Sequence, residues 1–336
     1  MLVSRSFMRE RLIAEPYPSL MDVLSSVIEV MRTGRPTSSR LRVGSPWRYR
    51  FAPYDGAGFH VLLRGAGWLI PEAAEPVQVS AGDVILLPHG SPHVLSSTPR
   101  SNGAVPFETA VADPDGHTEF LCGKYRLDRS RSHPLLAGLP AVIHLPAHVG
   151  RHPGLHAAIG LLGSEVHDDR PGRDSAIPRL LDLLLVYMTR AWLDDNAAAG
   201  WPRALHDPQL TAALEAIHAD PARAWRISEL AARAGLSRAT LARRFTAVTG
   251  QPPMTYLTWW RMTTAAQLLR ATDLPLPTVA QQAGYSSPFA FSHAFKRHFG
   301  LPPREYRSRV STAASQDGER PTGQHQRTAS WRTDCS

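Results

Sequence analysis

The hydrophobic positions along the chain change their period several times, and each period predicts a different kind of element. Residues 19–33 place an apolar side chain at every third or fourth position and end before Gly34, which predicts an amphipathic helix. From residue 41 to about residue 144 the apolar runs become short and are separated by Gly, Pro, Asn and Asp. Many short strands with frequent turns are typical of an all-β sandwich or barrel.

Helical periodicity returns after this β-rich stretch, in residues 155–166 and again in residues 177–193. The second of these helices has a broad apolar stripe, which consists of Leu180, Leu181, Leu184, Leu185, Met188 and Trp192. Such a stripe must be buried against another surface. Packing on its own domain and self-association between two copies are both open. We favour self-association, which predicts a homodimer.

An internal repeat occupies residues 226–307. The run Ala234-Gly235-Leu236-Ser237 recurs as Ala283-Gly284-Tyr285-Ser286, and each run is followed by a Phe, a Gly, a Pro and a Tyr. The two copies are offset by 49 residues at the first glycine and by 50 residues afterwards. Each copy predicts a short helix, a turn at the glycine and a second helix that starts near a serine cap, which is the helix-turn-helix arrangement.

The basic charge of the chain lies in this repeat segment. The chain has 336 residues, of which 43% are hydrophobic, and a net charge of +8. This length suggests about two domains. Residues 206–309 contain 13 Lys and Arg against 6 Asp and Glu, whereas residues 1–205 contain 21 and 20. A basic segment beside a neutral one indicates nucleic acid as its partner, although a solvated basic face would carry the same charge.

Cysteine usage and hydropathy indicate the compartment. Cys122 and Cys335 are the two cysteines of the chain and lie far apart in sequence. This pattern argues against a disulfide scaffold and fits a reducing compartment. No stretch reaches the roughly 18 apolar residues of a membrane span, and residues 1–15 lack the apolar core of a signal peptide. We therefore expect a cytoplasmic protein with no membrane partner.

The repeat segment resembles the DNA-binding domain of AraC/XylS-type transcription regulators. The resemblance rests on residues 283–300, AGYSSPFAFSHAFKRHFG, followed by Pro303 and Tyr306-Arg307. It implies two helix-turn-helix units bridged by a long helix at about residues 254–270. It also implies that two recognition helices enter successive major-groove segments of double-stranded promoter DNA, and that RNA polymerase is a further partner.

The exposed faces of the two recognition helices carry the candidate DNA contacts. The predicted base contacts are Arg238, Ala239, Thr240, Ala242 and Arg243 in the first helix, and Ser287, Pro288, Phe289, Ser292 and His293 in the second. Arg243 suits a bidentate contact to guanine, which is worth about 1–3 kcal/mol of discrimination. His293 stands where the family often has Arg, so readout there is weaker. Arg244, Lys296 and Arg297 are the predicted phosphate contacts, and a solvated side chain is the alternative for each exposed arginine.

Residues 20–145 resemble the cupin-type ligand domain of one branch of these regulators. Residues 82–93, GDVILLPHGSPH, match the second cupin half-motif, except that Ser97 stands where Asn is expected. In the strand of the first half-motif, His60 has Leu62 as its alternate neighbour instead of a second His. The full metal set of catalytic cupins is therefore absent.

His60, Leu62, His93 and Cys122 form the predicted effector pocket inside the barrel. Two imidazoles and a thiolate are acceptable ligands for zinc or a similar divalent metal, so His60, His93 and Cys122 are also the candidate metal ligands. A polar pocket without metal and hydrogen-bonded core histidines are the alternatives, and we favour these over a metal.

These patterns together predict an α+β multidomain protein. Its predicted segments are a mobile leader (1–18), a cupin-like effector-binding β-barrel or jelly roll (19–150), a helical linker and dimerisation region (151–205), an all-α DNA-binding domain (206–310) and a disordered tail (311–336). The predicted function is an effector-controlled, sequence-specific transcription regulator, and an activator because the family mostly activates. A cupin dioxygenase or isomerase is a weaker alternative, because position 62 lacks the His. An architectural DNA-binding protein that senses nothing is another.

Overall fold

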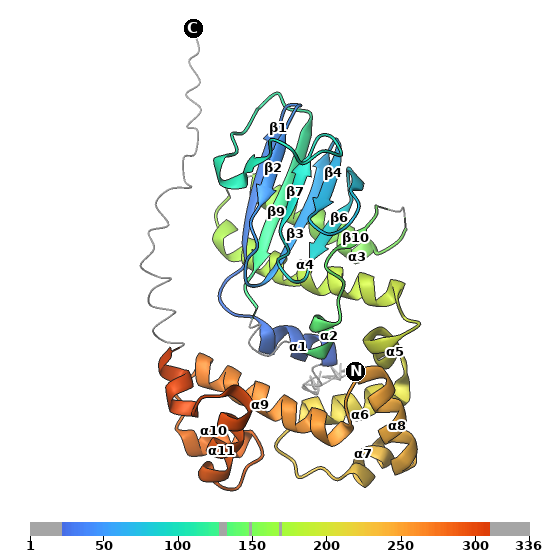
Figure 1. Ribbon diagram of the computed structural model, residues 1–336, viewed down its shortest axis with the longest axis vertical. Helices are drawn as coiled ribbons and strands as arrows, with labels where there is room; N and C mark the ends of the chain where they lie inside the picture. The colour runs from blue at the N-terminus through green and yellow to red at the C-terminus, as the bar shows by residue number, and fades with distance from the viewer. Residues whose placement is uncertain (1–21, 128–132, 148–149, 168–169, 310–336) are drawn as a thin grey trace, which may run out of the picture. The chain divides into compact units, whose positions relative to one another are not determined.

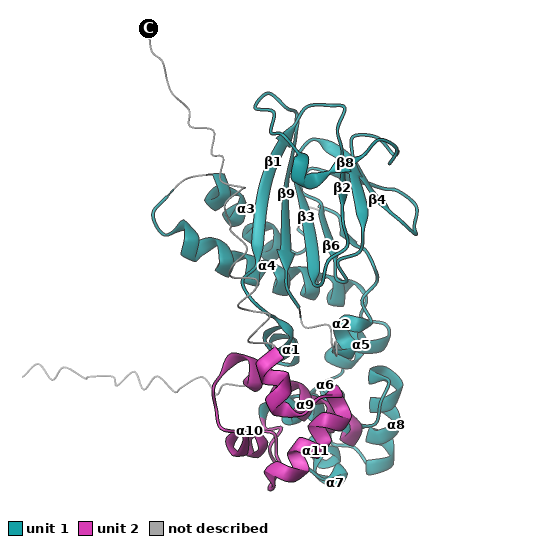
Figure 2. Ribbon diagram, turned by 60° about the vertical axis from the view of Figure 1, so that its left-hand side comes forward, with its two compact units in different colours: residues 1–219, 225–253 teal, residues 220–224, 254–336 magenta. Residues whose placement is uncertain are grey.

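The computed structural model describes residues 22–127, 133–147, 150–167 and 170–309. The predicted leader (1–18) and tail (311–336) lie outside these ranges. The chain divides into two units, one of residues 1–219 and 225–253 and the other of residues 220–224 and 254–336 (Figure 2). In the described part of the chain, no helix is both long and apolar enough to cross a membrane.

The strands of the first unit form two five-stranded sheets (Figure 1). One sheet has the order β1 (Thr37–Val43), β9 (Thr118–Tyr125), β3 (Ala57–Arg64), β6 (Val84–Leu87) and β10 (Ile143–Leu145). The other has the order β5 (Val77–Ser80), β4 (Ala66–Pro71), β7 (His93–Ser96), β2 (Arg48–Phe51) and β8 (Val105–Pro106), followed by the 3-10 turn η1 (Phe107–Thr109). All the pairings within these sheets are antiparallel except that of β2 with β8.

The sheets remain separate in the described residues, so the closed barrel predicted from the sequence is not observed. Three of the four edge strands, β5, β8 and β10, are only two to four residues long. Strands of this length offer too few backbone groups to continue a ladder around a barrel. The strand content and the turn-rich texture are as predicted, but closure needs long edges that the spacing of apolar residues does not reveal.

Alternate residues of the strands fill the space between the two sheets. This core consists of Leu41, Val43, Trp47, Tyr49, Phe51, Leu62, Leu69, Val79, Ile85, Leu87, Leu95, Phe120 and Cys122. The Trp47 ring lies 5.4 Å from the Phe120 ring. Strands β3, β6 and β9 are also buried on their other face, where the Tyr125 hydroxyl donates to the Leu181 carbonyl oxygen at 2.7 Å. The first sheet therefore needs a cover on both sides.

Helices supply the second cover. Helix α4 (Arg173–Asp195) lies against this face, and α1 (Val23–Met31) and α3 (Pro153–His167) pack on α4. The short helix α2 (Pro134–Ala137) precedes α3 in the chain. The Asp22 carboxylate caps α1 by accepting from the Ser25 amide at 2.9 Å. Most of the apolar stripe predicted on α4 is buried within the first unit, at Leu181, Leu184, Leu185 and Met188. Packing on its own domain, the alternative to self-association, thus accounts for this part of the stripe.

The remaining helices follow in chain order. They are α5 (Gly200–His206), α6 (Pro208–Ala219), α7 (Ile227–Arg233), α8 (Arg238–Thr249), α9 (Pro253–Ala271), α10 (Leu276–Gln282) and α11 (Pro288–Phe299). The region expected to be a helical linker, residues 151–205, contains α3 and α4 and ends within α5. Helix α9 agrees with the bridging helix expected at residues 254–270.

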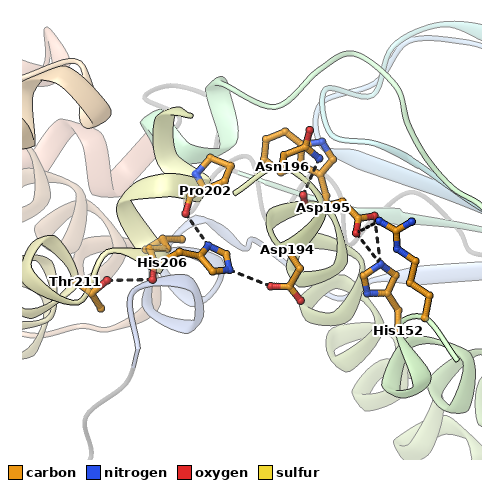
Figure 3. A network of polar contacts seen from close by, with 10 residues as sticks. His152, Asp194, Asp195, Asn196, Pro202, His206 and Thr211 are labelled. Carbon is orange, nitrogen blue, oxygen red and sulfur yellow. Dashed lines mark hydrogen bonds and ion pairs between the residues drawn. The ribbon is translucent and has the colours of Figure 1, made fainter. Parts of the chain in front are cut away.

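Polar contacts fix the end of α4 to the segments beside it (Figure 3). The Asp195 carboxylate accepts from Arg151 at 2.6 Å and lies 3.2 Å from His152 Nε2. The neighbouring Asp194 Oδ1 lies 3.3 Å from His206 Nε2, and His206 Nδ1 donates to the Pro202 carbonyl at 2.8 Å. These contacts tie α4 to α5 and give the connection between sheets and α6 a defined structure.

Candidate nucleic-acid interface and effector domain

Helices α7 and α8 are joined by a tight turn. Gly235 has a φ of +61°, a left-handed conformation that costs glycine least. The Ser237 hydroxyl then caps α8 by accepting from the Thr240 amide at 3.2 Å. Leu241 and Phe245 face the core, so the opposite face of α8 is left toward solvent.

The predicted DNA contacts of α8 lie on this outer face. Arg238, Ala239 and Arg243 are exposed, and Thr240 and Ala242 are half-buried. Arg243 therefore stands on the surface with the small Ala239 one turn before it.

Arg244 differs from its neighbour Arg243. Its Nη1 donates to Gln209 Oε1 at 2.7 Å, and its Nη2 forms an ion pair with the Asp207 carboxylate. Asp207 also accepts from the Gln209 amide at 3.1 Å at the start of α6. The guanidinium predicted to contact phosphate thus fastens α8 to α6. Sequence reasoning missed Asp207, and its place just before the Pro208 that opens α6 was the available signal.

Helices α10 and α11 repeat the same local geometry in the second unit. Gly284 has a φ of +75°, and a Cβ at this position would lie 2.8 Å from the Ala222 carbonyl oxygen, so glycine is required. The Ser287 hydroxyl caps α11 by accepting from the Ala290 amide at 3.4 Å. Phe291 and Phe295 are buried. Local sequence therefore sets both helix pairs in the same way.

The outer face of α11 is more apolar at its start and more basic at its end. Pro288, Phe289, His293, Lys296 and Arg297 are exposed. Ser287 and Ser292 are half-buried, and the Ser292 hydroxyl donates to the Pro288 carbonyl at 2.8 Å. Like those of α8, the predicted base contacts of α11 lie on or beside one outward face.

The four residues predicted to form an effector pocket lie together in the core between the sheets. His60, Leu62, His93 and Cys122 are each less than a tenth exposed. Cys122 Sγ lies 2.8 Å from His60 Nδ1, and His60 Nε2 lies 2.7 Å from His93 Nε2. The structure therefore brings the histidines and the thiol into one chain of polar contacts rather than around an empty space.

Hydrogen-bonding partners determine where the protons of this chain lie. His93 Nδ1 lies 2.8 Å from the Ser91 carbonyl oxygen, which can only accept, so His93 carries its proton on Nδ1. Neutral His93 then accepts at Nε2 from His60, and neutral His60 accepts at Nδ1 from the Cys122 thiol. Burial lowers the pKa of both histidines and raises the pKa of Cys122, so all three groups are held neutral.

These side chains do not fit a metal in this arrangement. Cys122 lies at the Nδ1 edge of the His60 ring and His93 lies at the Nε2 edge, so an ion on either nitrogen would miss one of the other two. In the residues that the structure describes, no three His, Cys, Asp or Glu side chains are grouped to hold a metal. Hydrogen-bonded core histidines, one of the alternatives open from the sequence, describe the arrangement.

Two further residues shape this cluster and were missed from the sequence. The Phe51 ring stacks on His93 with 4.7 Å between ring centroids, and the Ser91 carbonyl sets the tautomer of His93. Ser91 lies two residues before His93 within the quoted cupin half-motif, so its spacing was a usable signal. Phe51 comes from β2, which pairs with β7 at Phe51 and His93, and sequence spacing alone does not reveal that register.

Lowering the pH should destabilise the protein through the buried histidines. Burial lowers the pKa of His93 from its ordinary 6.5 to about 4, so between these values the unfolded chain binds a proton that the folded chain does not. Stability present above pH 6.5 is therefore lost as the pH falls toward 4, and His93 alone should account for about 2 kcal/mol between pH 7.5 and pH 5. Thermal unfolding at several pH values measures this. His93→Asn should flatten the dependence and His117→Asn, at an exposed site, should not; equal slopes for both would refute the assignment.

Removing the Arg244 side chain should destabilise the first unit more than removing that of Arg243. Arg244→Ala deletes an ion pair and a hydrogen bond between α8 and α6, which should lower the free energy of unfolding by roughly 1 kcal/mol. Arg243→Ala, one residue away on the exposed face, is the matched control and should unfold like the parent protein. An Arg244→Ala variant with unchanged stability and weakened DNA binding would favour the phosphate contact expected from the sequence.

Known protein families match both the N-terminal and the C-terminal part of the chain. Residues 22–194 match the family described as Cupin, and residues 230–309 match the family described as Helix-turn-helix domain. The chain is 35% identical over 299 residues to a putative AraC-like transcription regulator from Streptomyces lividans, which covers 85% of this chain and 98% of the relative. It is 30% identical over 303 residues to the RCS-specific HTH-type transcriptional activator RclR from Escherichia coli (strain K12), with 88% and 100% covered.

Among solved structures, the chain is similar to a transcriptional regulator with an AraC-type DNA-binding domain from Chromobacterium violaceum. The match covers 32% of this chain and 95% of that protein. Its sequence identity is 30% and its TM-score is 0.30. The Cupin match spans just over half of the chain, and the Streptomyces lividans relative is matched over nearly its whole length. The chain therefore belongs to the AraC-like transcription regulators, a non-enzymatic family that binds DNA through a helix-turn-helix domain.

Proposed function

We propose that this protein is a sequence-specific regulator that reads promoter DNA with α8 and α11, each the second helix of a helix-turn-helix unit. The observation that carries the proposal is the repeated local geometry. Each helix follows a left-handed glycine, starts at a serine cap and buries one apolar face, leaving the opposite face outward. A recognition helix needs this combination to present side chains to a major groove.

The outward residues take the roles that their chemistry allows. The proposed base contacts are Arg238, Ala239, Thr240, Ala242 and Arg243 from α8 and Ser287, Pro288, Phe289, Ser292 and His293 from α11. Lys296 and Arg297, exposed in the last turns of α11, are the proposed phosphate contacts. Arg244 is assigned to holding α8 on α6, because its guanidinium already has Asp207 and Gln209 as partners.

A small-molecule effector is the proposed input of the cupin domain. The predicted pocket residues His60, Leu62, His93 and Cys122 are buried, so they line no open space at the surface. A polar hollow of about 390 Å³ lies just outside them and is lined by Pro53, Tyr54, Asp55, His89, Gly90, Ser91 and Pro92. Ser91 links this hollow to His93 through the hydrogen bond described above. The hollow is therefore the proposed entry point for the effector.

Contacts within the first unit offer a route from this domain to α8. Helix α1 packs on α6, and α5 and α6 both pack on α8. The ring of His133, which caps α2, lies 4.8 Å from the Trp201 ring of α5 and 6.3 Å from the His218 ring of α6. An effector that prefers one arrangement of these helices would change the population able to bind DNA.

Activation through RNA polymerase is the proposed output. Its support is the relative RclR, named as a transcriptional activator and matched along its whole length. A homodimer is also proposed, because Leu161 of α3 and Leu183 of α4 are 56% and 40% exposed although the two helices pack on each other.

Footprinting on the DNA that flanks its own gene tests the DNA-reading proposal. A protected segment and a steep fall of affinity with rising salt are expected, because phosphate contacts release counterions. Arg243→Ala should weaken specific binding by about tenfold, since a bidentate guanine contact is worth about 1–3 kcal/mol, and should change binding to random DNA far less. Arg304→Ala, at an exposed site outside both recognition helices, is the control. Equal losses on both DNAs would contradict the assignment of Arg243.

The dimer can be tested by light scattering at micromolar concentration. The expected mass is twice the 36.9 kDa of one chain. Leu183→Glu places a charge on the proposed contact, and an unpaired charge is costly to bury. The measured mass should therefore shift toward that of a single chain. Val111→Glu, at another highly exposed apolar position, should leave the mass unchanged. A single species of one-chain mass in the parent protein would overturn the proposal.

A further inference from the structure

The most exposed large apolar side chain in the described part of the chain is that of Phe289, at 83%. Isolated apolar residues are common on protein surfaces, so exposure by itself indicates nothing. The position of Phe289 is the informative feature. It lies in the first turn of α11, directly after Pro288 and two residues after the Ser287 cap. The N-terminal residues of a recognition helix are the ones that contact base edges.

The rest of α11 keeps this ring pointed outward. Phe291 and Phe295 are both fully buried and hold the opposite face of the helix against the core. His293 lies four residues after Phe289, and Lys296 and Arg297 lie seven and eight residues after it. All three are exposed, so with Phe289 they form one outward stripe. The stripe begins with an aromatic ring and ends with two cations.

The internal repeat supplies a comparison within the same chain. With the offset of 50 residues, Phe289 corresponds to Ala239 of α8 and His293 corresponds to Arg243. Both helices begin at equivalent serine caps, Ser237 and Ser287. In α8 a small residue precedes a long cation, whereas in α11 a large ring precedes a shorter imidazole. The two helices therefore present different chemistry at equivalent positions.

A phenylalanine ring can neither donate nor accept a hydrogen bond. Among the groups that base pairs present in the major groove, the thymine 5-methyl group is the apolar one. We propose that Phe289 contacts the 5-methyl group of a thymine and so specifies a T·A pair in the part of the operator bound by α11. This inference rests on the proposed DNA-reading function and makes the operator asymmetric, with a guanine opposite Arg243 and a thymine opposite Phe289.

Deoxyuridine substitution tests this contact, because it removes the 5-methyl group and leaves base pairing intact. Each thymine of the protected segment is replaced by deoxyuridine, one at a time, and the affinity is measured for the full-length protein and for Phe289→Ala. At one position the parent protein should lose about three- to fivefold in affinity, the value for one buried methyl-sized group. Phe289→Ala should bind the thymine and deoxyuridine sites equally at that position. Phe289→Leu should keep part of the preference.

The controls separate this proposal from the function on which it rests. Val111→Ala removes an exposed apolar side chain outside the repeat and should keep the full preference for thymine. The parent protein can protect a specific segment while each deoxyuridine lowers its affinity no more than it lowers the affinity of Phe289→Ala. That result overturns the thymine contact, and the DNA-reading function stands. Phe289→Ala can also lose the same affinity, relative to the parent protein, for the thymine site and for the deoxyuridine site. That result, expected for a ring wedged between bases or bound to another protein, also overturns the contact. Failure of the parent protein to protect any segment would overturn the proposed function itself.

Discussion

The need to bury both faces of strands β3, β6 and β9 governs the first unit. Their side chains are buried at nearly every position, so one cover is insufficient. The second sheet covers one face, and α4 lies against the other, where the Tyr125 hydroxyl donates to the Leu181 carbonyl oxygen of α4. Helix α1 packs on both α4 and α6, so it links the helix that covers the sheet to the helices that pack on α8. The sheets and α8 are thus connected through a continuous set of packed helices.

Two groups of buried or half-buried polar side chains in this unit show how such groups are accommodated. The chain of contacts from Cys122 through His60 and His93 to the Ser91 carbonyl uses each proton once and leaves no charge in the core. The same arrangement occupies the imidazole nitrogens that a metal would require. Arg244 shows the other solution, because a half-buried guanidinium keeps its charge and pairs with Asp207.

The repeat separates the residues that set the start of α8 and α11 from the residues on the outward faces of these helices. Gly235 and Gly284, with the caps Ser237 and Ser287, set the same turn and the same helix start twice. The exposed outward positions carry no such constraint, because their side chains lie largely in solvent. They are therefore free to differ, as Ala239 and Phe289 do. An asymmetric set of contacts can evolve on a symmetric scaffold without loss of stability.

The sequence by itself determined the elements of this protein and its family. Periodicity, glycine turns and serine caps act within a few residues, so they predicted α1, α4, α8 and α11 close to their observed positions. The motif of residues 283–300 indicated the AraC-type domain, and the resemblance to that family implied α9. Only the tertiary structure decided which surfaces pair. The stripe of α4 is an apolar face whatever covers it, and Arg244 is a basic residue until Asp207, distant in sequence, is folded against it. The predicted barrel became two sheets and the predicted pocket became a filled core for the same reason: local preferences are encoded within short segments, whereas the choice of partner depends on packing among residues far apart along the chain.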